Sequence, residues 1–120
     1  MTFKKTDIKN PEGKLGILIP GIGAVSTTFI AGVMLVRKGL AKPVGSLTQM
    51  GKLRVGKGDT ASEINIKDFI NLADLKDLEF GGWDISDESV YDAAKRSQVL
   101  SNEHIEMVKE ELVKIRPWKA

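Results

Sequence analysis

Cysteine is absent from the 120-residue sequence, and histidine occurs only once. Without cysteine the chain has no disulfides, thiolate metal sites or cysteine nucleophiles, and His104 alone cannot build a histidine-rich metal site. We therefore expect no metal ion. The 18 basic residues exceed the 16 acidic residues by only two, which excludes the strongly basic composition typical of nucleic-acid-binding proteins. We expect no nucleic-acid partner.

The start of the chain also lacks the apolar core and small-residue cleavage site of a secretory signal. Residues 1–14 are instead polar and rich in lysine, with Pro11 and Gly13 as breakers, and we expect them to form a flexible lead-in. Hydrophobic residues make up 42% of the chain and charged residues 28%, as in an ordinary globular protein. These features favour a cytoplasmic location.

Charge is missing from one long stretch, residues 15–36, which reads LGILIPGIGAVSTTFIAGVMLV. A transmembrane helix needs roughly 20 apolar residues, so a single-span membrane protein is one interpretation. However, Pro20, Gly21 and Gly23 would break such a helix where lipid offers no hydrogen-bond partners. The alternative divides the stretch into a buried strand, a glycine turn and a helix. We favour this division and expect no membrane partner.

The strand of this interpretation covers residues 15–20, an apolar run typical of parallel sheets. The helix covers residues 25–38 and is closed by Gly39, a common C-terminal cap. A second strand at residues 43–51 would complete a β–α–β unit. The later patterns predict a mobile polar loop at 52–63, a short helical segment at 68–78, a strand at 79–85, a helix at 86–98 and an amphipathic helix at 102–115.

The last of these helices gathers its apolar side chains on one face, which is expected to pack on the core. The residues are Ile105, Val108, Leu112 and Ile115. Because helices alternate with strands along the chain, we expect an α/β fold with a partial Rossmann-like parallel sheet and flanking helices.

The glycine turn is a candidate site for a dinucleotide. Gly21 permits a sharp turn after the strand, and Gly23 lets a pyrophosphate approach the backbone. The amides at the start of the following helix are then expected to be unpaired and to form an anion site. The third glycine of the G-x-G-x-x-G pattern is replaced by Ser26, and a plain glycine turn would explain the same residues. The amides in question belong to Ala24, Val25, Ser26 and Thr27.

An acidic residue about 20 positions further on usually binds the ribose in such folds. Here the predicted second strand ends in Gln49 and Met50, which are neutral. Asp84 is the first acidic residue at the end of a predicted strand. It is a candidate ribose ligand, although an aspartate at this point could also simply cap a turn.

Four blocks of the sequence, in this order, resemble inositol-3-phosphate synthase, also called myo-inositol-1-phosphate synthase, of the bacterial kind: GILIPGIGAVSTTFIAGV, GLAKPVGSLTQMG, KDFINLADLKDLEFGGWDI and YDAAK. The resemblance runs from about residue 13 to residue 120. It implies an NAD-dependent isomerase that converts glucose 6-phosphate to 1L-myo-inositol 1-phosphate. In that reaction the sugar is oxidised, enolised, closed by aldol attack and reduced again, so that NAD is not consumed.

The resemblance also implies roles for particular residues. Asp84, in GGWDI, would contact the ribose hydroxyls of NAD, and Gly81 and Gly82 would let the cofactor approach that strand. Val25 and Ser26 stand where many members of the family have asparagines. Valine offers no side-chain hydrogen bond to NAD, while the backbone amides of the turn remain available.

Members of the family have a Rossmann domain and a separate catalytic, tetramer-forming domain, and their chains are several times longer. The catalytic lysines lie in the other domain, so no lysine of this sequence inherits that role. We expect residues 15–120 to be a fragment of the NAD-binding domain and to be inactive alone. The competing hypothesis is a stand-alone dinucleotide-binding or regulatory module without catalysis.

Overall fold

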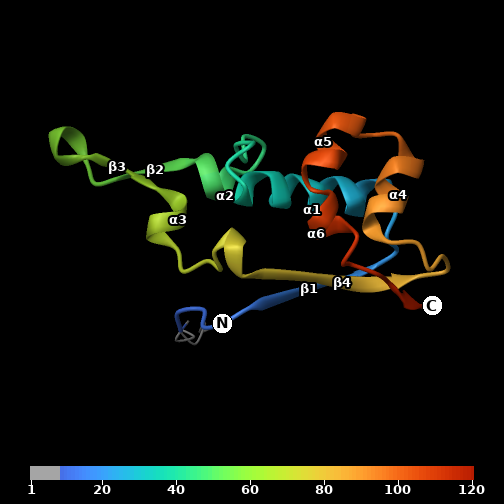
Figure 1. Cartoon of the computed structure of the whole chain (residues 1–120). Helices are drawn as coiled ribbons and strands as arrows, with labels where there is room; N and C mark the ends of the chain where they lie inside the picture. Colours follow the sequence, from blue (N-terminus) through green and yellow to red (C-terminus); the bar gives the residue numbers. More distant parts are fainter. Residues whose placement is uncertain (1–8) are drawn as a thin grey trace.

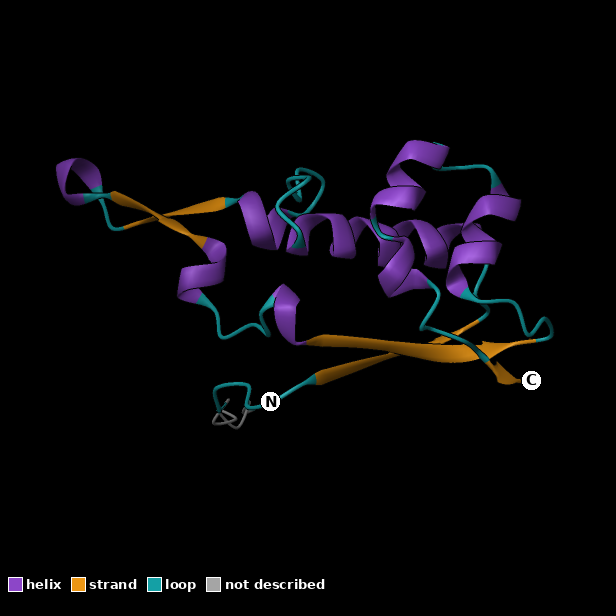
Figure 2. Ribbon diagram, viewed as in Figure 1, coloured by secondary structure: helices purple, strands orange, loops and turns teal. Residues whose placement is uncertain are grey.

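The fold is built around a three-stranded parallel sheet in the order β1–β4–β5. The computed structural model describes residues 9–120, so the predicted lead-in at residues 1–14 falls largely outside the described residues. Figures 1 and 2 show the helices above one face of the sheet. The strands are β1 (Leu15–Pro20), β4 (Leu78–Asp84) and β5 (Trp118–Lys119).

Strand β1 has the predicted bounds, and β4 begins and ends one residue earlier than expected. The two strands pair in parallel along the whole of β1, from Leu15 opposite Leu78 to Pro20 opposite Trp83. Gly82, opposite Ile19, leaves room for the Ile19 carbonyl oxygen, which would lie 2.0 Å from a Cβ at position 82. The close pairing of the two strands therefore depends on a glycine at this point.

The predicted helix after the glycine turn is α1 (Ala24–Arg37). Its inner face packs in the core, where Ile30 and Ala31 are fully buried. The helix ends as predicted at Gly39, whose φ of 71° is a conformation that favours glycine. The Gly39 N–H donates to the Val36 carbonyl at 3.0 Å and the Leu40 N–H to the Leu35 carbonyl at 2.9 Å, so the end is a Schellman motif.

The predicted strand at residues 43–51 is wrong. The Ser46 N–H donates to the Pro43 carbonyl at 2.9 Å, which makes a turn, and the short helix α2 (Leu47–Met50) follows. Val44 and Leu47 are 79% and 73% exposed, whereas a central strand of a parallel sheet would be buried. Proline and glycine within this short apolar run favour the turn, and β4 takes the place beside β1.

The expected mobile loop at residues 52–63 is also wrong, because this segment forms an antiparallel hairpin. Strands β2 (Lys52–Val55) and β3 (Ser62–Asn65) pair in register, with a 3-10 turn, η1 (Gly58–Thr60), between them. Gly56 has a φ of 102°, which allows the chain to reverse. In Figure 1 the hairpin, in green, projects away from the sheet.

The predicted helix at 68–78 is replaced by two separate turns of helix. These are α3 (Ile66–Phe69) and the 3-10 turn η2 (Leu75–Asp77). The side chain of Asp74 accepts a hydrogen bond from the Lys76 N–H at 3.1 Å and so caps η2. The prediction of helical structure in this region is thus partly confirmed, but the continuous helix is not.

Helix α4 (Val90–Ser97) confirms the helix predicted at 86–98, with a later start. Its N-cap is Ser89, whose hydroxyl oxygen accepts from the Asp92 N–H at 3.2 Å. The helix predicted at 102–115 is interrupted at Val108, giving α5 (Asn102–Met107) and α6 (Lys109–Leu112). The predicted apolar face is nevertheless correct. Ile115 is partly buried, and the other three members are fully buried: Ile105, Val108 and Leu112.

The core lies between the sheet, α1 and the helices α4 to α6. The opposite face of the sheet is open: Leu18 is 57% exposed, and the rings of Trp83 and Trp118 lie with their centroids 5.3 Å apart on the same side. Residues 15–36 are divided between β1 and α1, and within residues 9–120 no helix is long and apolar enough to cross a membrane. The single-span interpretation is therefore not supported.

Gly82→Ala should lower the free energy of unfolding by about 3 kcal/mol, because the new methyl group would collide with the Ile19 carbonyl and force β1 away from β4. Urea unfolding measures the loss. Gly16→Ala is a matched control in β1, since no described atom lies within 4 Å of a Cβ at Gly16. A Gly82→Ala variant as stable as Gly16→Ala would contradict this account of the strand pairing.

Candidate functional site

The candidate site lies at the carboxyl end of the parallel sheet, where ligands bind in open α/β folds. Strand β1 leads there into the glycine turn, Gly21 to Gly23, and the turn leads into α1. Strand β4 ends beside it at Asp84. The Ile22 N–H donates to Asp84 Oδ2 at 2.7 Å, so the structure brings together the two parts of the site that the sequence predicted separately.

The glycine turn is fixed by its main chain. Gly21 has a φ of 94°, a conformation that favours glycine, and its N–H donates to the Trp83 carbonyl at 2.7 Å. From the other side, the hydroxyl of Ser26 donates to the Gly21 carbonyl at 2.8 Å. Ser26, which replaces the third glycine of the pattern, therefore closes the turn.

Gly23 is the N-cap of α1 and has no side chain to pair with the first amides of the helix. Helix geometry leaves the amides of Ala24, Val25 and Ser26 without an acceptor inside the helix. The Thr27 N–H, in contrast, donates to the Gly23 carbonyl at 3.0 Å. The expectation that the Thr27 amide is unpaired is therefore wrong, because it makes the first hydrogen bond of the helix.

The start of α1 is open to solvent. Val25 is 85% exposed, and the first turn of the helix contains no acidic residue. The positive end of the helix dipole is therefore not neutralised by a carboxylate of that turn. At Gly23 the backbone has a negative φ of −107°, and no atom of the described residues lies within 4 Å of where a Cβ would stand. Neither backbone strain nor packing within residues 9–120 accounts for a glycine there.

Both carboxylate oxygens of Asp84 accept backbone hydrogen bonds. Besides the bond from Ile22, the Ser86 N–H donates to Oδ1 at 3.0 Å. The bonds from Ser86 and Ile22 stabilise the ionised form and lower the pKa of Asp84 below its ordinary value. Asp84 thus caps a turn, as the simpler interpretation held, and also contacts the glycine turn.

A hollow of about 300 Å³ opens next to Asp84 at the ends of β4 and β5. Ser86, Asp87 and Lys119 line it together with Asp84 and Ile85. The hollow therefore combines carboxylates, a hydroxyl and an ammonium group within reach of the glycine turn. Ser86 and Lys119 were not singled out from the sequence, because only the pairing of β5 with β4 brings Lys119 beside Asp84.

Gly81 and Gly82 lie against protein atoms. A Cβ at Gly81 would lie 3.1 Å from the ring of Trp118, and one at Gly82 would meet the carbonyl of Ile19. Protein atoms, from β5 and β1, occupy the space that these glycines leave. The structure therefore gives a packing reason for both glycines.

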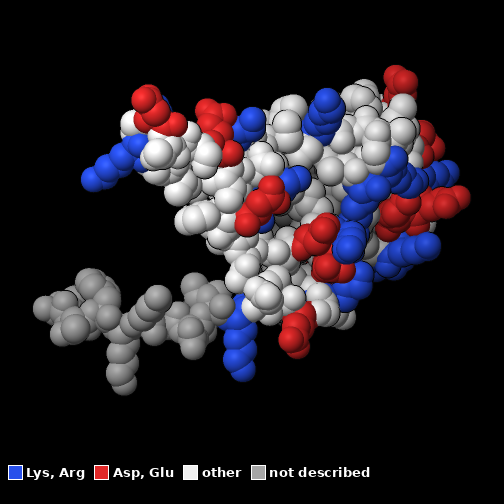
Figure 3. All heavy atoms as spheres, turned by 90° about the vertical axis from the view of Figure 1, so that its left-hand side faces the viewer, with Lys and Arg blue, Asp and Glu red and all other residues white. Residues whose placement is uncertain are grey.

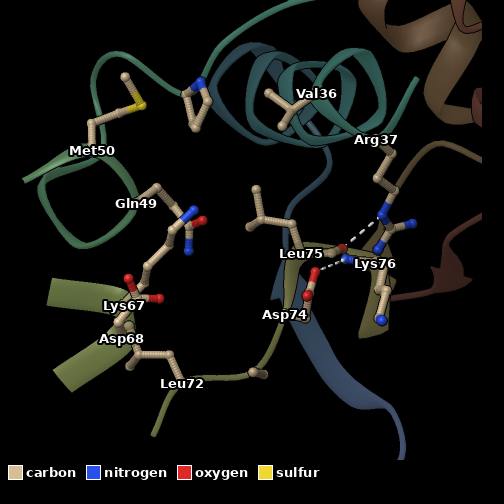
Figure 4. A pocket seen from close by; sticks show the side chains of 12 residues that line it. Val36, Arg37, Gln49, Met50, Lys67, Asp68, Leu72, Asp74, Leu75 and Lys76 are labelled. Carbon is tan, nitrogen blue, oxygen red and sulfur yellow. Dashed lines mark hydrogen bonds between the residues drawn. The ribbon is translucent and has the colours of Figure 1, made fainter. Parts of the chain in front are cut away.

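A larger hollow lies elsewhere, at the other end of α1 (Figure 4). It has a volume of about 690 Å³, and Lys67, Asp68 and Asp74 project around it. The guanidinium group of Arg37 is already engaged there, with its Nε donating to the Leu75 carbonyl at 2.7 Å. Because both basic and acidic side chains surround this hollow, its electrostatic potential does not favour a ligand of one charge.

Charged side chains are similarly mixed on the hairpin end of the molecule. In Figure 3 blue and red side chains are interspersed on this face, separated by wide uncharged areas. Within residues 9–120 there is also no group of three or more histidine, aspartate and glutamate side chains that could hold a metal ion. The glycine turn with Asp84 therefore stays the best-defined candidate site.

The lowered pKa of Asp84 predicts a dependence of stability on pH. The ionised carboxylate stabilises the folded state. This stabilisation is complete at pH values above 3.8, the ordinary pKa of the carboxyl group, and it is lost as the pH falls below that value. The unfolding midpoints of wild type and Asp84→Asn should therefore differ at pH 7 and converge as the pH is lowered from 4 towards 2. Thermal unfolding across this range is the measurement. Asp87→Asn is the control, and equal convergence for both variants would contradict the role of Asp84.

Comparison with known proteins gives concordant results. The model of an NAD-binding domain described as Myo-inositol-1-phosphate synthase matches residues 15–120. The chain is 45% identical to inositol-3-phosphate synthase 1 of Bacteroides thetaiotaomicron over 117 residues, which are 97% of this chain and 27% of that protein. It is 38% identical to isozyme 1 of Arabidopsis thaliana, over 80% of this chain and 21% of that protein. The chain thus spans about a quarter of the length of these relatives.

A solved structure supports the fold. The crystal structure of inositol-3-phosphate synthase from Caenorhabditis elegans superposes with a TM-score of 0.73, at 23% identity, over 85% of this chain and 22% of that one. The expected α/β fold is thereby confirmed, and the family model confirms NAD as the family's cofactor. On this evidence the chain belongs to the myo-inositol-1-phosphate synthase family, within its NAD-binding domain.

Proposed function

We propose that residues 15–120 are part of the NAD-binding domain of an enzyme that converts glucose 6-phosphate to 1L-myo-inositol 1-phosphate. The observation that carries the proposal is the glycine turn, which lies at the carboxyl end of a parallel strand, opens a helix and contacts Asp84 of the neighbouring strand. The family match over the same residues supports it. NAD, when bound, would supply the oxidation and the later reduction of the sugar.

The pyrophosphate of NAD would lie at the start of α1. The amides of Ala24, Val25 and Ser26 are directed there, and the helix dipole favours a negative charge. Gly21 shapes the turn, whereas Thr27 is buried at 1% exposure and supports the first turn by packing. Val25 and Ser26 would thus contribute to NAD binding through their backbone amides. The absence of the family's asparagines would remove only side-chain contacts with NAD.

Gly23 gives the proposal its most specific support. Within the described residues neither φ nor packing requires a glycine there, because a Cβ at Gly23 would meet no atom within 4 Å. A diphosphate that approaches the backbone closely would explain the residue. Asp84 would face the adenosine end, where its carboxylate and the neighbouring hollow could receive ribose hydroxyls.

The open face of the sheet argues against the alternative, which is a stand-alone binding module. Parallel sheets are normally covered on both faces, yet Leu18, Trp83 and Trp118 are 57%, 41% and 54% exposed here. This favours additional polypeptide over the sheet and therefore a larger enzyme. The sugar-binding and catalytic residues would belong to that remainder. The tetramer remains a prediction from the family resemblance, and the cytoplasmic location remains a prediction from the composition of the sequence.

Val25→Glu should weaken NAD binding by at least about tenfold, because a carboxylate in the first turn of α1 would repel the pyrophosphate and neutralise the helix dipole. The exposed position should tolerate the change without loss of stability. Val25→Gln is the matched control, with similar size and no charge. Calorimetric titration with NAD measures the affinities, and equal affinity of the two variants would contradict a pyrophosphate site at α1.

The 120-residue chain should form no inositol phosphate from glucose 6-phosphate and NAD, since we assign the groups that bind and activate the sugar to another part of the enzyme. The assay measures inositol phosphate released over time, with a full-length relative as the positive control. Sedimentation of the same sample with NAD separates the alternatives: tight binding by a stable monomer favours the module. Turnover by the isolated chain would contradict the proposal that the sugar-binding and catalytic groups belong to another part of the enzyme.

A further inference from the structure

Asp84 links two segments that are far apart in the sequence. Its Oδ2 atom accepts from the Ile22 N–H at 2.7 Å and its Oδ1 atom from the Ser86 N–H at 3.0 Å. Ile22 precedes Asp84 by 62 residues and lies in the middle of the glycine turn. Hydrogen bonds to an ionised acceptor are shorter and stronger than bonds between neutral groups. The carboxylate therefore ties the turn to the end of β4.

The bond to Ile22 is the part of this link that depends on a side chain. The preceding amide, Gly21 N–H, donates to the backbone carbonyl of Trp83. Any residue at position 83 would supply this acceptor. The Ile22 N–H has its acceptor in the carboxylate of Asp84. The Ile22 side chain is buried at 2% exposure, so the peptide cannot rotate freely towards another partner.

We propose that Asp84 is a positioning residue for the anion site at the start of α1. By fixing the Ile22 amide, the carboxylate sets the glycine turn in the conformation that leaves the amides of Ala24, Val25 and Ser26 open to a diphosphate. This role rests on the proposed binding of NAD, but it differs from a contact between Asp84 and ribose. The diphosphate itself need not touch Asp84.

The two roles predict opposite effects on a ligand that has no ribose. Asp84 carries a negative charge near the anion site. If it served only as a ribose contact, Asp84→Asn would leave the affinity for inorganic pyrophosphate unchanged or raise it. If it positions the turn, the same substitution weakens pyrophosphate binding, because the asparagine amide group offers one acceptor oxygen where the carboxylate offered two.

Hydrogen exchange of single amides tests the link without any ligand. In Asp84→Asn the Ile22 amide should exchange about tenfold faster or more than in wild type, and its acceleration should exceed that of the core amides of Ile105 and Leu112, which report only the change in global stability. Asp87→Asn removes the same charge from the same hollow and should leave Ile22 unchanged. An unchanged Ile22 rate in Asp84→Asn would overturn the proposal, and so would an equal acceleration of the core amides.

Binding of NAD and of inorganic pyrophosphate to the same three proteins completes the test. Asp84→Asn should weaken both by about tenfold, whereas Asp87→Asn should weaken neither. Loss of NAD affinity with undiminished pyrophosphate affinity would overturn the positioning role and leave Asp84 as a ribose contact. If wild type bound neither compound, the proposed NAD site within residues 15–120 would fail, and the Ile22 exchange rate would still decide whether Asp84 holds the turn.

Discussion

The close parallel pairing of β1 with β4 is the constraint on which the rest of the structure depends. The pairing extends along all of β1, and it requires a glycine at position 82 because the Ile19 carbonyl occupies the space of a side chain. It brings the ends of the two strands together, so that Ile22 and Asp84, which are 62 residues apart in the sequence, can form a hydrogen bond. The same pairing supplies the surface on which α1 packs, since Phe80 of β4 meets Phe29 edge to face.

A cation in the last turn of α1 holds the end of the long connection to β4. Arg37, in the last turn of α1, donates through Nε to the Leu75 carbonyl and through Nη2 to the Leu78 carbonyl, and so fixes the start of β4. This anchor allows the intervening residues to leave the sheet and form the hairpin of β2 and β3 without disturbing the register of β1 and β4. The hairpin therefore lies away from the candidate site, which is at the opposite end of the sheet.

Sequence patterns predicted the elements whose signals are local. Strand β1 and helix α1 follow from one change of periodicity at Pro20 to Gly23, and α4 lies within the helix predicted at 86–98. The prediction failed at residues 43–51, where an apolar run between glycines resembles a strand but has no partner strand and folds into a turn and α2. Whether a short apolar run becomes a strand depends on what pairs with it, and that information is not local.

The sequence by itself determined the glycine turn, the helix that follows it and the family, because these depend on residue types at fixed, short spacings. Only the tertiary structure decided that Asp84 binds the Ile22 amide, that Lys119 lies beside Asp84, and that Gly81 and Gly82 make room for Trp118 and Ile19. These contacts join residues of different strands. Their partners are set by sheet order and register, which emerge only when the whole chain packs.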